Sequence, residues 1–167
     1  MWATWLLGTA LAASGLADQR AGAWADAHAG LGVGGAPAGV GFGTDSSVGV
    51  WSGRYDPDYA LGRYVGVGLG LRTGPDGLLA GMLEVRRGVD LLIVGLHGFG
   101  AAGWDLGAGA PLAEIGLGVK ARVRPTGRFV GWELRLRGGA EFADTVRPVG
   151  CVTLGAAFAA PWRRTAR

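Results

Sequence analysis

The run LAEIGLGVKARVR, residues 112–124, decides the fold because apolar positions alternate in it with charged residues or glycine. One face of the run includes Ile115 and Leu117, and the other includes Glu114 and Lys120. Such an alternation, with a period of two, predicts a β-strand whose two faces meet different surroundings.

The same pattern recurs along the chain and predicts eight strands. Gly, Pro and Asp residues with turn-forming chemistry separate the runs. The connections are short and no helical period long enough for a crossover is found, so neighbouring strands are expected to be antiparallel. The expected strands cover residues 25–34, 39–51, 59–72, 78–87, 91–102, 112–124, 129–138 and 149–162.

Composition excludes several other classes of protein. The chain has 167 residues, of which 49% are hydrophobic, 17% are charged and 34 are glycine, with one cysteine and a net charge of +3. A disordered chain would be less hydrophobic, and a disulfide scaffold would need more cysteines. The glycines follow no collagen repeat. One domain of ordinary size is the natural expectation.

The face opposite the aliphatic rows decides between a soluble barrel and a membrane barrel. It combines glycine with Arg and Glu, whereas a solvated strand face normally avoids glycine, which weakens a strand. A narrow eight-stranded barrel has room for such side chains in its lumen, and we expect the glycines of 59–72 to accommodate arginines of 129–138. The predicted polar network of the lumen consists of Glu84, Arg86, Glu114, Lys120, Arg122, Glu133, Arg135 and Arg137.

The turn after residue 124 leaves two registers open for the last part of this network. A two-residue turn at Pro125 and Thr126 places Glu114 opposite Arg137. A shift by one residue places Lys120 opposite Glu133. Each register creates a cross-strand ion pair and keeps the faces in phase.

Length and aromatic placement agree with a membrane barrel. Eight strands of about 10 residues, the length that crosses a bilayer, fit within the chain. Arg63 and Arg87 lie on the apolar face near strand ends, where an arginine costs little. We expect an aromatic girdle at one interface, formed by Trp24, Trp51, Tyr55, Tyr59, Trp132 and Trp162.

Residues 24–162 resemble the small eight-stranded outer-membrane β-barrels of Gram-negative bacteria, of the outer membrane protein A and X type. The resemblance rests on the alternating pattern. It implies an all-β fold, an antiparallel up-and-down transmembrane β-barrel of eight strands, located in the bacterial outer membrane. It also implies a monomer whose last strand ends in an aromatic residue read by the barrel-assembly machinery. The basic tail 163–167 overruns that position, Trp162.

Residues 1–17 resemble a secretory signal peptide, with an apolar stretch followed by small residues. They depart from the pattern because no Lys or Arg lies near Met1. A buried helix, or a true start further upstream, remains the alternative.

The basic residues indicate lipid rather than nucleic acid as a partner. They alternate with apolar residues in strands and form no single basic surface. We expect Arg54, Arg63, Arg87 and Arg147 to contact outer-membrane lipid headgroups or lipopolysaccharide.

No motif for catalysis or for a cofactor is found. GxGxxG at 30–35 and 98–103 opens no helix, as a dinucleotide site requires, and we expect no cofactor and no metal. His28 or His97 could act as a base with Asp26 or Glu84, but a structural histidine in the lumen is the simpler interpretation.

Two further features of nucleophilic enzymes are missing from the sequence. Outer-membrane lipid A deacylases carry a His-x-Ser pair, whereas residues 97–99 here read His-Gly-Phe. Ser46, Ser47 and Ser52 lack a nucleophile elbow. Cys151, on the polar face, is expected to be a small buried filler.

The leading hypothesis is an integral outer-membrane barrel with a plugged polar lumen and a structural or interaction role, without enzymatic activity. The alternatives are a narrow pore or small-solute transporter, a lipid-modifying outer-membrane enzyme, and a soluble lipocalin-like barrel that binds a ligand.

Overall fold

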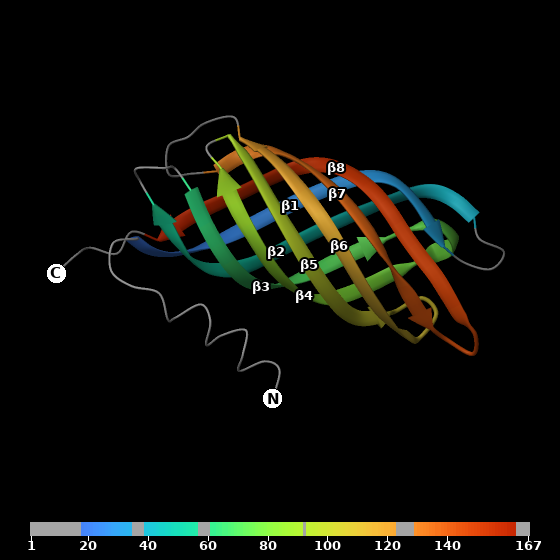
Figure 1. Cartoon of the computed structure of the whole chain (residues 1–167). Helices are drawn as coiled ribbons and strands as arrows, with labels where there is room; N and C mark the ends of the chain where they lie inside the picture. Colours follow the sequence, from blue (N-terminus) through green and yellow to red (C-terminus); the bar gives the residue numbers. More distant parts are fainter. Residues whose placement is uncertain (1–17, 35–38, 57–60, 92, 123–128, 163–167) are drawn as a thin grey trace.

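A computed structural model describes residues 18–34, 39–56, 61–91, 93–122 and 129–162, which form a barrel (Figure 1). The one helical segment among these residues is a short 3-10 turn, η1, at Pro75–Gly77. Within the described part of the chain, no helix has the length and apolar character needed to cross a bilayer. The strands are β1 (Asp18–Gly34), β2 (Gly39–Asp56), β3 (Leu61–Thr73), β4 (Leu79–Leu91), β5 (Val94–Asp105), β6 (Ala110–Arg122), β7 (Phe129–Phe142) and β8 (Val146–Trp162).

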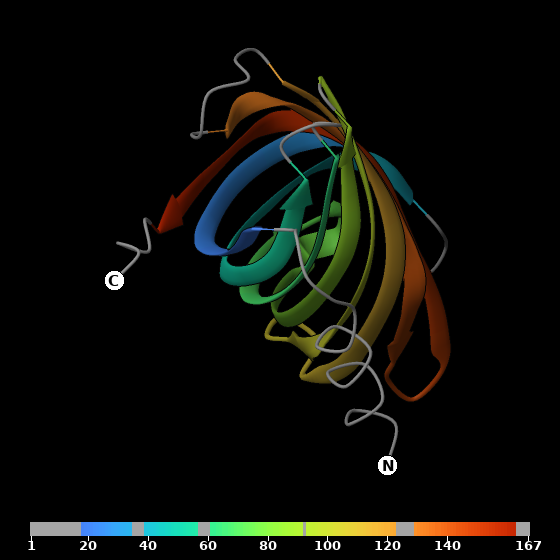
Figure 2. The same cartoon turned by 60° about the vertical axis from the view of Figure 1, so that its left-hand side comes forward.

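Each strand pairs antiparallel with the next one in sequence, and β1 closes the barrel by pairing with β8. Ala27 lies opposite Ala156 at this closure. Figure 2 looks obliquely into the barrel and shows the strands tilted around a common axis. The predicted all-β fold, with eight antiparallel strands in up-and-down order, is confirmed.

The two ends of the barrel differ. At the end called here the terminal end, β1 begins and β8 finishes, on the left of Figure 1. At the opposite end, called the mouth, η1 and the connections at residues 106–109 and 143–145 join the strands. Two backbone hydrogen bonds tie η1 to the start of β4, from Gly74 N to Leu78 O (3.1 Å) and from Leu78 N to Pro75 O (3.3 Å).

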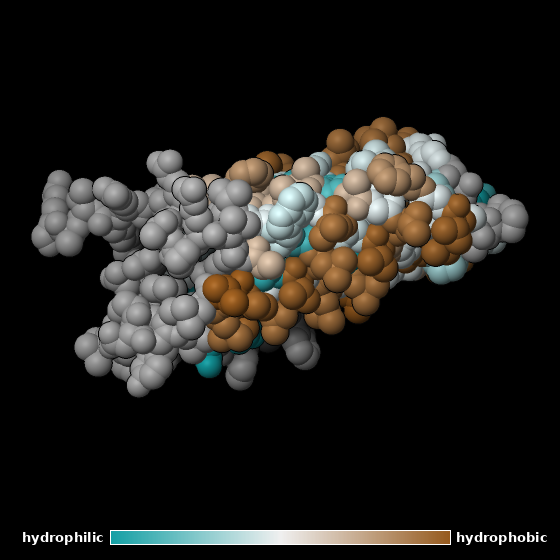
Figure 3. All heavy atoms as spheres, turned by 90° about the horizontal axis from the view of Figure 1, so that it is seen from above, coloured by the Kyte–Doolittle hydropathy of each residue, from teal (hydrophilic) through white to brown (hydrophobic). Residues whose placement is uncertain are grey.

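Burial alternates along the strands and shows which way each face points. Leu117, Val119 and Leu134 are 65%, 44% and 49% exposed, whereas Glu133 and Arg135 are fully buried. Because the strands form a closed ring, the buried charged row faces the lumen and the aliphatic row faces outward. The predicted orientation of the two faces is confirmed, and the apolar outer surface is visible in Figure 3.

Several strands run further than the sequence pattern predicted, whereas β5 begins at Val94 rather than at residue 91, because Leu91 still belongs to β4. β1 begins at Asp18 rather than at residue 25, and β2 continues to Asp56 rather than to Trp51. Backbone pairing continues here beyond the clear alternation. In β5, where the sequence left the faces ambiguous, His97 and Phe99 point into the lumen. The candidate signal peptide, 1–17, and the tail, 163–167, lie outside the described residues.

The predicted aromatic girdle is wrong for Trp24 and Trp51. Trp24 is 7% exposed, and its indole nitrogen donates to Ser47 Oγ in the lumen (3.1 Å). Trp51 lies on the same inward row of β2 as Ser47, and its indole nitrogen is buried. Trp132, by contrast, is 60% exposed on the outer surface. Whether a tryptophan points into the lumen or outward depends on its place in the alternation along the strand. Its distance from the strand end does not decide this. The side chains of Tyr55, Tyr59 and Trp162 are not described.

Candidate functional site: the charged lumen and its mouth

Arg135 on β7 occupies the centre of the lumen and binds carboxylates from three strands. Its Nη2 donates to Asp26 Oδ2 on β1 (2.6 Å), and its Nη1 donates to Asp45 Oδ2 on β2 (2.9 Å). Its Nε donates to Glu133 of its own strand. The planar guanidinium has donors enough to satisfy several acceptors at once. Arg135 therefore connects opposite walls of the barrel.

Arg137 and Arg86 extend this network around the ring. Arg137 Nη2 donates to Asp45 Oδ2 (2.5 Å) and to Glu84 Oε2 on β4 (3.0 Å). Arg86 Nη1 donates to Asp26 Oδ2 (2.7 Å), and its Nε donates to Glu84. All of these side chains are buried. Each charge thus has a partner of opposite sign, as burial requires.

The register between β6 and β7 places Lys120 opposite Glu133, so the second of the two predicted registers is present. Lys120 Nζ lies 3.8 Å from Glu133 Oε2 and donates to the hydroxyl of Tyr64 (3.2 Å). Glu114 is opposite Gly139, yet its Oε2 still lies 3.5 Å from Arg137 Nη1, because a long side chain reaches a diagonal neighbour. Glu114 also forms an ion pair with Arg72 on β3.

Several lumen glycines make room for aromatic rings. A Cβ at Gly68 of β3 would lie 2.7 Å from Cζ2 of Trp24, well inside van der Waals contact. On β6, a Cβ at Gly118 would overlap the imidazole of His97. The expectation that the glycines of 59–72 accommodate arginines of 129–138 is therefore wrong. Arg137 of β7 instead places its guanidinium carbon 4.4 Å from the centroid of the Phe99 ring, and Arg86 of β4 lies over Trp24 in the same way at 4.6 Å.

The two histidines belong to the same buried network. His97 Nε2 lies 3.2 Å from Glu133 Oε1, and His28 Nδ1 lies 3.7 Å from Asp26 Oδ1. Ser47, on the lumen side, donates its hydroxyl to Asp26 (2.8 Å). Within the described ranges, no group of three or more His, Cys, Asp or Glu side chains is arranged to hold a metal ion. The described side chains thus form one connected network of ion pairs and hydrogen bonds.

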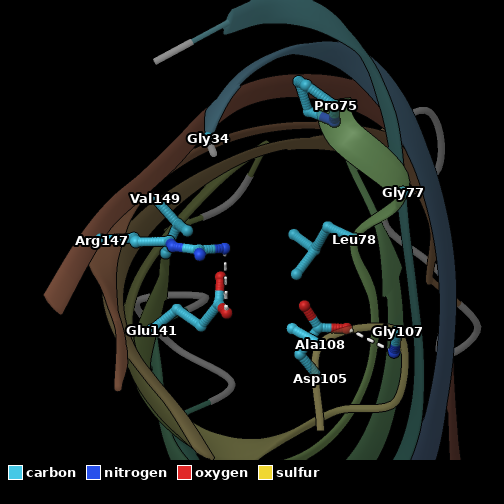
Figure 4. Close-up of a pocket in the computed structure, with 10 residues that line it drawn as sticks. All are labelled: Gly34, Pro75, Gly77, Leu78, Asp105, Gly107, Ala108, Glu141, Arg147 and Val149. Atoms are coloured by element: carbon cyan, nitrogen blue, oxygen red, sulfur yellow. Dashed lines mark hydrogen bonds and ion pairs between the residues drawn. The ribbon is translucent and has the colours of Figure 1, made fainter. Parts of the chain in front are cut away.

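The polar network ends below the mouth at an apolar layer. Its members, which come from the start of β4 and from β5, β6 and β8, are Leu78, Ala80, Met82, Ala101, Leu112 and Val149. Above this layer lies a pocket of about 330 Å³, lined by residues that include Leu78, Asp105, Glu141 and Arg147 (Figure 4). From the centre to the mouth, the lumen therefore contains first the charged network, then the apolar layer and finally the open pocket.

The structure places most of the predicted network residues in contact with one another. Glu84, Arg86, Glu114, Glu133, Arg135 and Arg137 are all buried in the lumen, and Lys120 joins them through Glu133. The side chain of Arg122 lies outside the description. Asp26, Asp45 and Arg72 also belong to the network, although they were not among the predicted members. Their positions in the alternating pattern place them on the inward face of each strand. Whether they join the network depends on which side chains reach them across the lumen.

The predicted lipid-contacting arginines divide between the two ends of the barrel. Arg63 and Arg87 are exposed on the outer surface of β3 and β4, and Arg54 lies opposite Arg63 on β2, all near the terminal end. Arg147 instead lies at the mouth, where its Nη1 is 3.9 Å from Glu141 Oε1. Cys151 is 9% exposed on the inward row of β8.

Comparison with known proteins gives little further information. No family model matches the chain, and no curated protein matches it. Among solved structures, it is similar to that of Ail, the attachment invasion locus protein of Yersinia pestis, with 11% identity and a TM-score of 0.31. The similarity covers 84% of this chain and 98% of that one. A likeness at this level establishes no function, so the conclusions below rest on the geometry of the barrel.

Proposed function

We propose that this chain is an integral outer-membrane β-barrel with a plugged polar lumen and a structural or interaction role. The observation that carries the proposal is the inversion of the barrel: aliphatic side chains cover its outer surface while paired charges fill its interior. A soluble lipocalin-like barrel would need the opposite arrangement, with an apolar interior that receives the ligand.

The outer surface supports the membrane location. Its exposed apolar side chains cover every strand and form what we call the apolar belt: Leu31, Val40, Val48, Val50, Val67, Leu69, Leu83, Val85, Leu96, Ile115, Leu117, Val119, Leu134, Leu136, Val152 and Leu154. Soluble monomers rarely expose contiguous apolar patches beyond a few hundred Å². A closed barrel satisfies every strand edge internally, which a lipid environment requires.

Aromatic side chains at both ends of the apolar belt suggest where the bilayer interfaces lie. Trp132 and Phe158 are exposed near the terminal end, and Phe42, Trp104 and Phe142 are exposed near the mouth. Aromatic residues favour the boundary between headgroups and hydrocarbon. Two girdles, one at each end, replace the single girdle that the sequence suggested.

The outward arginines of the terminal end fit anionic headgroups. Arg54, Arg63 and Arg87 come from adjacent strands at the edge of the apolar belt, where a lipid-facing arginine costs only ~0–1 kcal/mol. With the start of β1 and the end of β8 on the periplasmic side, these arginines would meet the inner leaflet of the outer membrane. Lipid is therefore the proposed partner, with the barrel-assembly machinery during biogenesis and a monomer as the final state.

Charge pairing in the central lumen favours a plug over a pore. The buried carboxylates of Asp26, Asp45, Glu84, Glu114 and Glu133 are matched in number by the basic groups of Arg72, Arg86, Lys120, Arg135 and Arg137. The apolar layer below the mouth adds a barrier to ions. Solute transport through this lumen would require several buried ion pairs to separate.

Membrane fractionation followed by gel electrophoresis tests the location. We expect the protein in the outer-membrane fraction, with faster migration in SDS when unheated than when boiled. Recovery of a monomer in the aqueous fraction without detergent would refute the membrane assignment. Planar bilayer recording tests the plug: we expect no conductance steps from the folded protein, and regular steps would establish the pore instead.

A further inference from the structure

The pocket at the mouth contains a buried carboxylate that lacks a hydrogen-bond partner. Glu141 lies on the wall formed by β7 and β8, and its side chain is 5% exposed. Its Oε1 is buried and accepts no hydrogen bond from any described group. Figure 4 shows this carboxylate pointing into the hollow, toward the side chains of Leu78 and Asp105 on the facing wall. Buried polar atoms are normally hydrogen-bonded, so this oxygen remains available to accept a hydrogen bond from a bound donor.

Arg147 is the nearest cation, and it satisfies Glu141 only in part. Its Nη1 lies 3.9 Å from Glu141 Oε1, which is too long for a hydrogen bond. The side chain of Arg147 is 36% exposed overall, and its Nε is buried without a hydrogen-bond partner, so the pair leaves polar atoms of both residues unsatisfied. The pairing also shows that the Glu141 carboxylate attracts a cationic group that donates hydrogen bonds.

The other walls of the pocket favour a cation with an alkyl portion. Asp105 is 3% exposed, and its Oδ1 is held by the backbone amides of Leu79 (3.3 Å) and Gly107 (2.8 Å). Two carboxylates therefore line the pocket together with one partly exposed guanidinium, and the balance is negative. Leu78 and Val149 supply apolar surface at its base. A volume of about 330 Å³ is at the lower end of the range for small-ligand sites.

We propose that the mouth pocket binds a small organic cation, a primary alkylamine, whose ammonium group donates to Oε1 of Glu141. The alkyl chain lies against Leu78 and Val149, and Arg147 is displaced toward solvent. Arg147 thus competes with the ligand for Glu141. The site does not depend on the membrane location or on the plug, because every residue that forms it lies inside the mouth.

The test uses the folded full chain in a non-ionic detergent, with 1,5-diaminopentane as the probe and uncharged 1,5-pentanediol as the matched control compound. Titration calorimetry measures affinity, and amide NMR shifts at Gly107 and Ala108 locate the binding. We expect the diamine to bind and to shift these amides, and the diol to do neither.

Three variants distinguish the proposed site from general attraction of cations. Glu141→Gln should weaken binding roughly tenfold or more, the worth of a hydrogen bond to a charged group. Arg147→Gln should tighten binding about two- to fivefold, because it removes the competing ion pair. Asp144→Asn, an equal charge change on the exposed β7–β8 connection, should leave affinity unchanged.

Absence of binding to the folded wild-type protein would overturn the proposal. So would an equal loss of affinity in Glu141→Gln and Asp144→Asn, which would indicate diffuse attraction to the surface. A weakening by Arg147→Gln would show that Arg147 is part of the site rather than a competitor, and would also refute the assignment. Misfolding lowers affinity, so it cannot imitate the tighter binding expected of Arg147→Gln. Faster migration of unheated Glu141→Gln in SDS checks that this variant is folded.

Discussion

The lumen and the apolar belt are built from the same eight strands, yet we expect them to differ in which substitutions they tolerate. In the lumen, Glu133 and Arg135 are fully buried, and each contacts charged groups from other strands. On the apolar belt, Leu134 lies between them in sequence and is 49% exposed. A buried charge in the lumen is stabilised by its ion-pair partners. A side chain on the outer surface needs only to be compatible with the lipid or water around it. Adjacent residues on one strand should therefore show different sensitivities to the same kind of change.

The largest effect is expected from removing the central guanidinium. Arg135→Met leaves the carboxylates of Asp26, Asp45 and Glu133 with one cation fewer, and breaking a buried network in this way costs about 3–5 kcal/mol. Reversible urea unfolding in lipid vesicles, followed by tryptophan fluorescence, measures the free energy of unfolding. Arg87→Met, the same change on the outer surface, serves as the control. If Arg135→Met lowers the free energy of unfolding by less than about 1 kcal/mol, the network does not stabilise the barrel as we propose.

The next largest effect concerns a charge placed on the apolar belt. Leu117→Arg should destabilise the folded barrel in bilayers by about 2–4 kcal/mol, because it buries a guanidinium near the middle of the membrane. Val146→Arg, at the exposed mouth of the barrel, should cost only ~0–1 kcal/mol. Comparable unfolding free energies for the two variants in vesicles would mean that Leu117 does not face hydrocarbon.

A smaller effect tests the close packing of the lumen. Gly118→Ala adds a Cβ that would overlap the imidazole of His97, and such overpacking costs about 1–3 kcal/mol. Adding His97→Ala should recover part of the loss, since the double substitution makes room for the methyl group. Gly100→Ala is the matched control, because a Cβ there meets no atom within 4 Å. If His97→Ala and Gly118→Ala are simply additive in unfolding experiments, the two residues do not share this space.

The smallest effect is expected at the outer edge of the terminal end. Arg63→Ala should change the free energy of unfolding by less than about 1 kcal/mol, as is usual for an exposed charge. The change should be larger in vesicles that contain phosphatidylglycerol than in neutral vesicles, and salt should reduce the difference. Equal unfolding curves in both lipid mixtures would mean that Arg63 has no contact with anionic headgroups.

The number of strands, their order and the face on which each residue lies could be predicted from the sequence. The alternation with a period of two is a local property of each strand, so no distant contact is needed to recognise it. Leu117 and Lys120 fall on opposite faces wherever the strand lies in the barrel. The pairing of Lys120 with Glu133 was one of two possibilities, because it depends on the turn around residues 123–128. Both alternatives kept the faces in phase, so the pattern alone did not select one.

The interior packing could not be predicted, because it depends on contacts across the barrel. Trp24 lies on the inward row, yet its position near a strand end suggested an interfacial role. Its contacts with Ser47 and Arg86 join residues far apart in sequence. The same holds for Asp26 and Asp45, whose roles follow from the reach of Arg135 across the lumen. The mouth pocket also escaped prediction, since Glu141 and Asp105 meet there from different strands.

Spin labels attached to Leu117→Cys, Val119→Cys and Leu134→Cys, each in a Cys151→Ala background, test the central claim most directly. The folded variants are placed in lipid vesicles, and the collision rates of each label with oxygen and with a water-soluble nickel complex are measured. If the aliphatic rows face hydrocarbon, all three labels will collide often with oxygen and rarely with nickel. Frequent collision with nickel would place these residues in water, and shielding from both reagents would place them in a protein core. Either result would contradict an inverted barrel in a membrane.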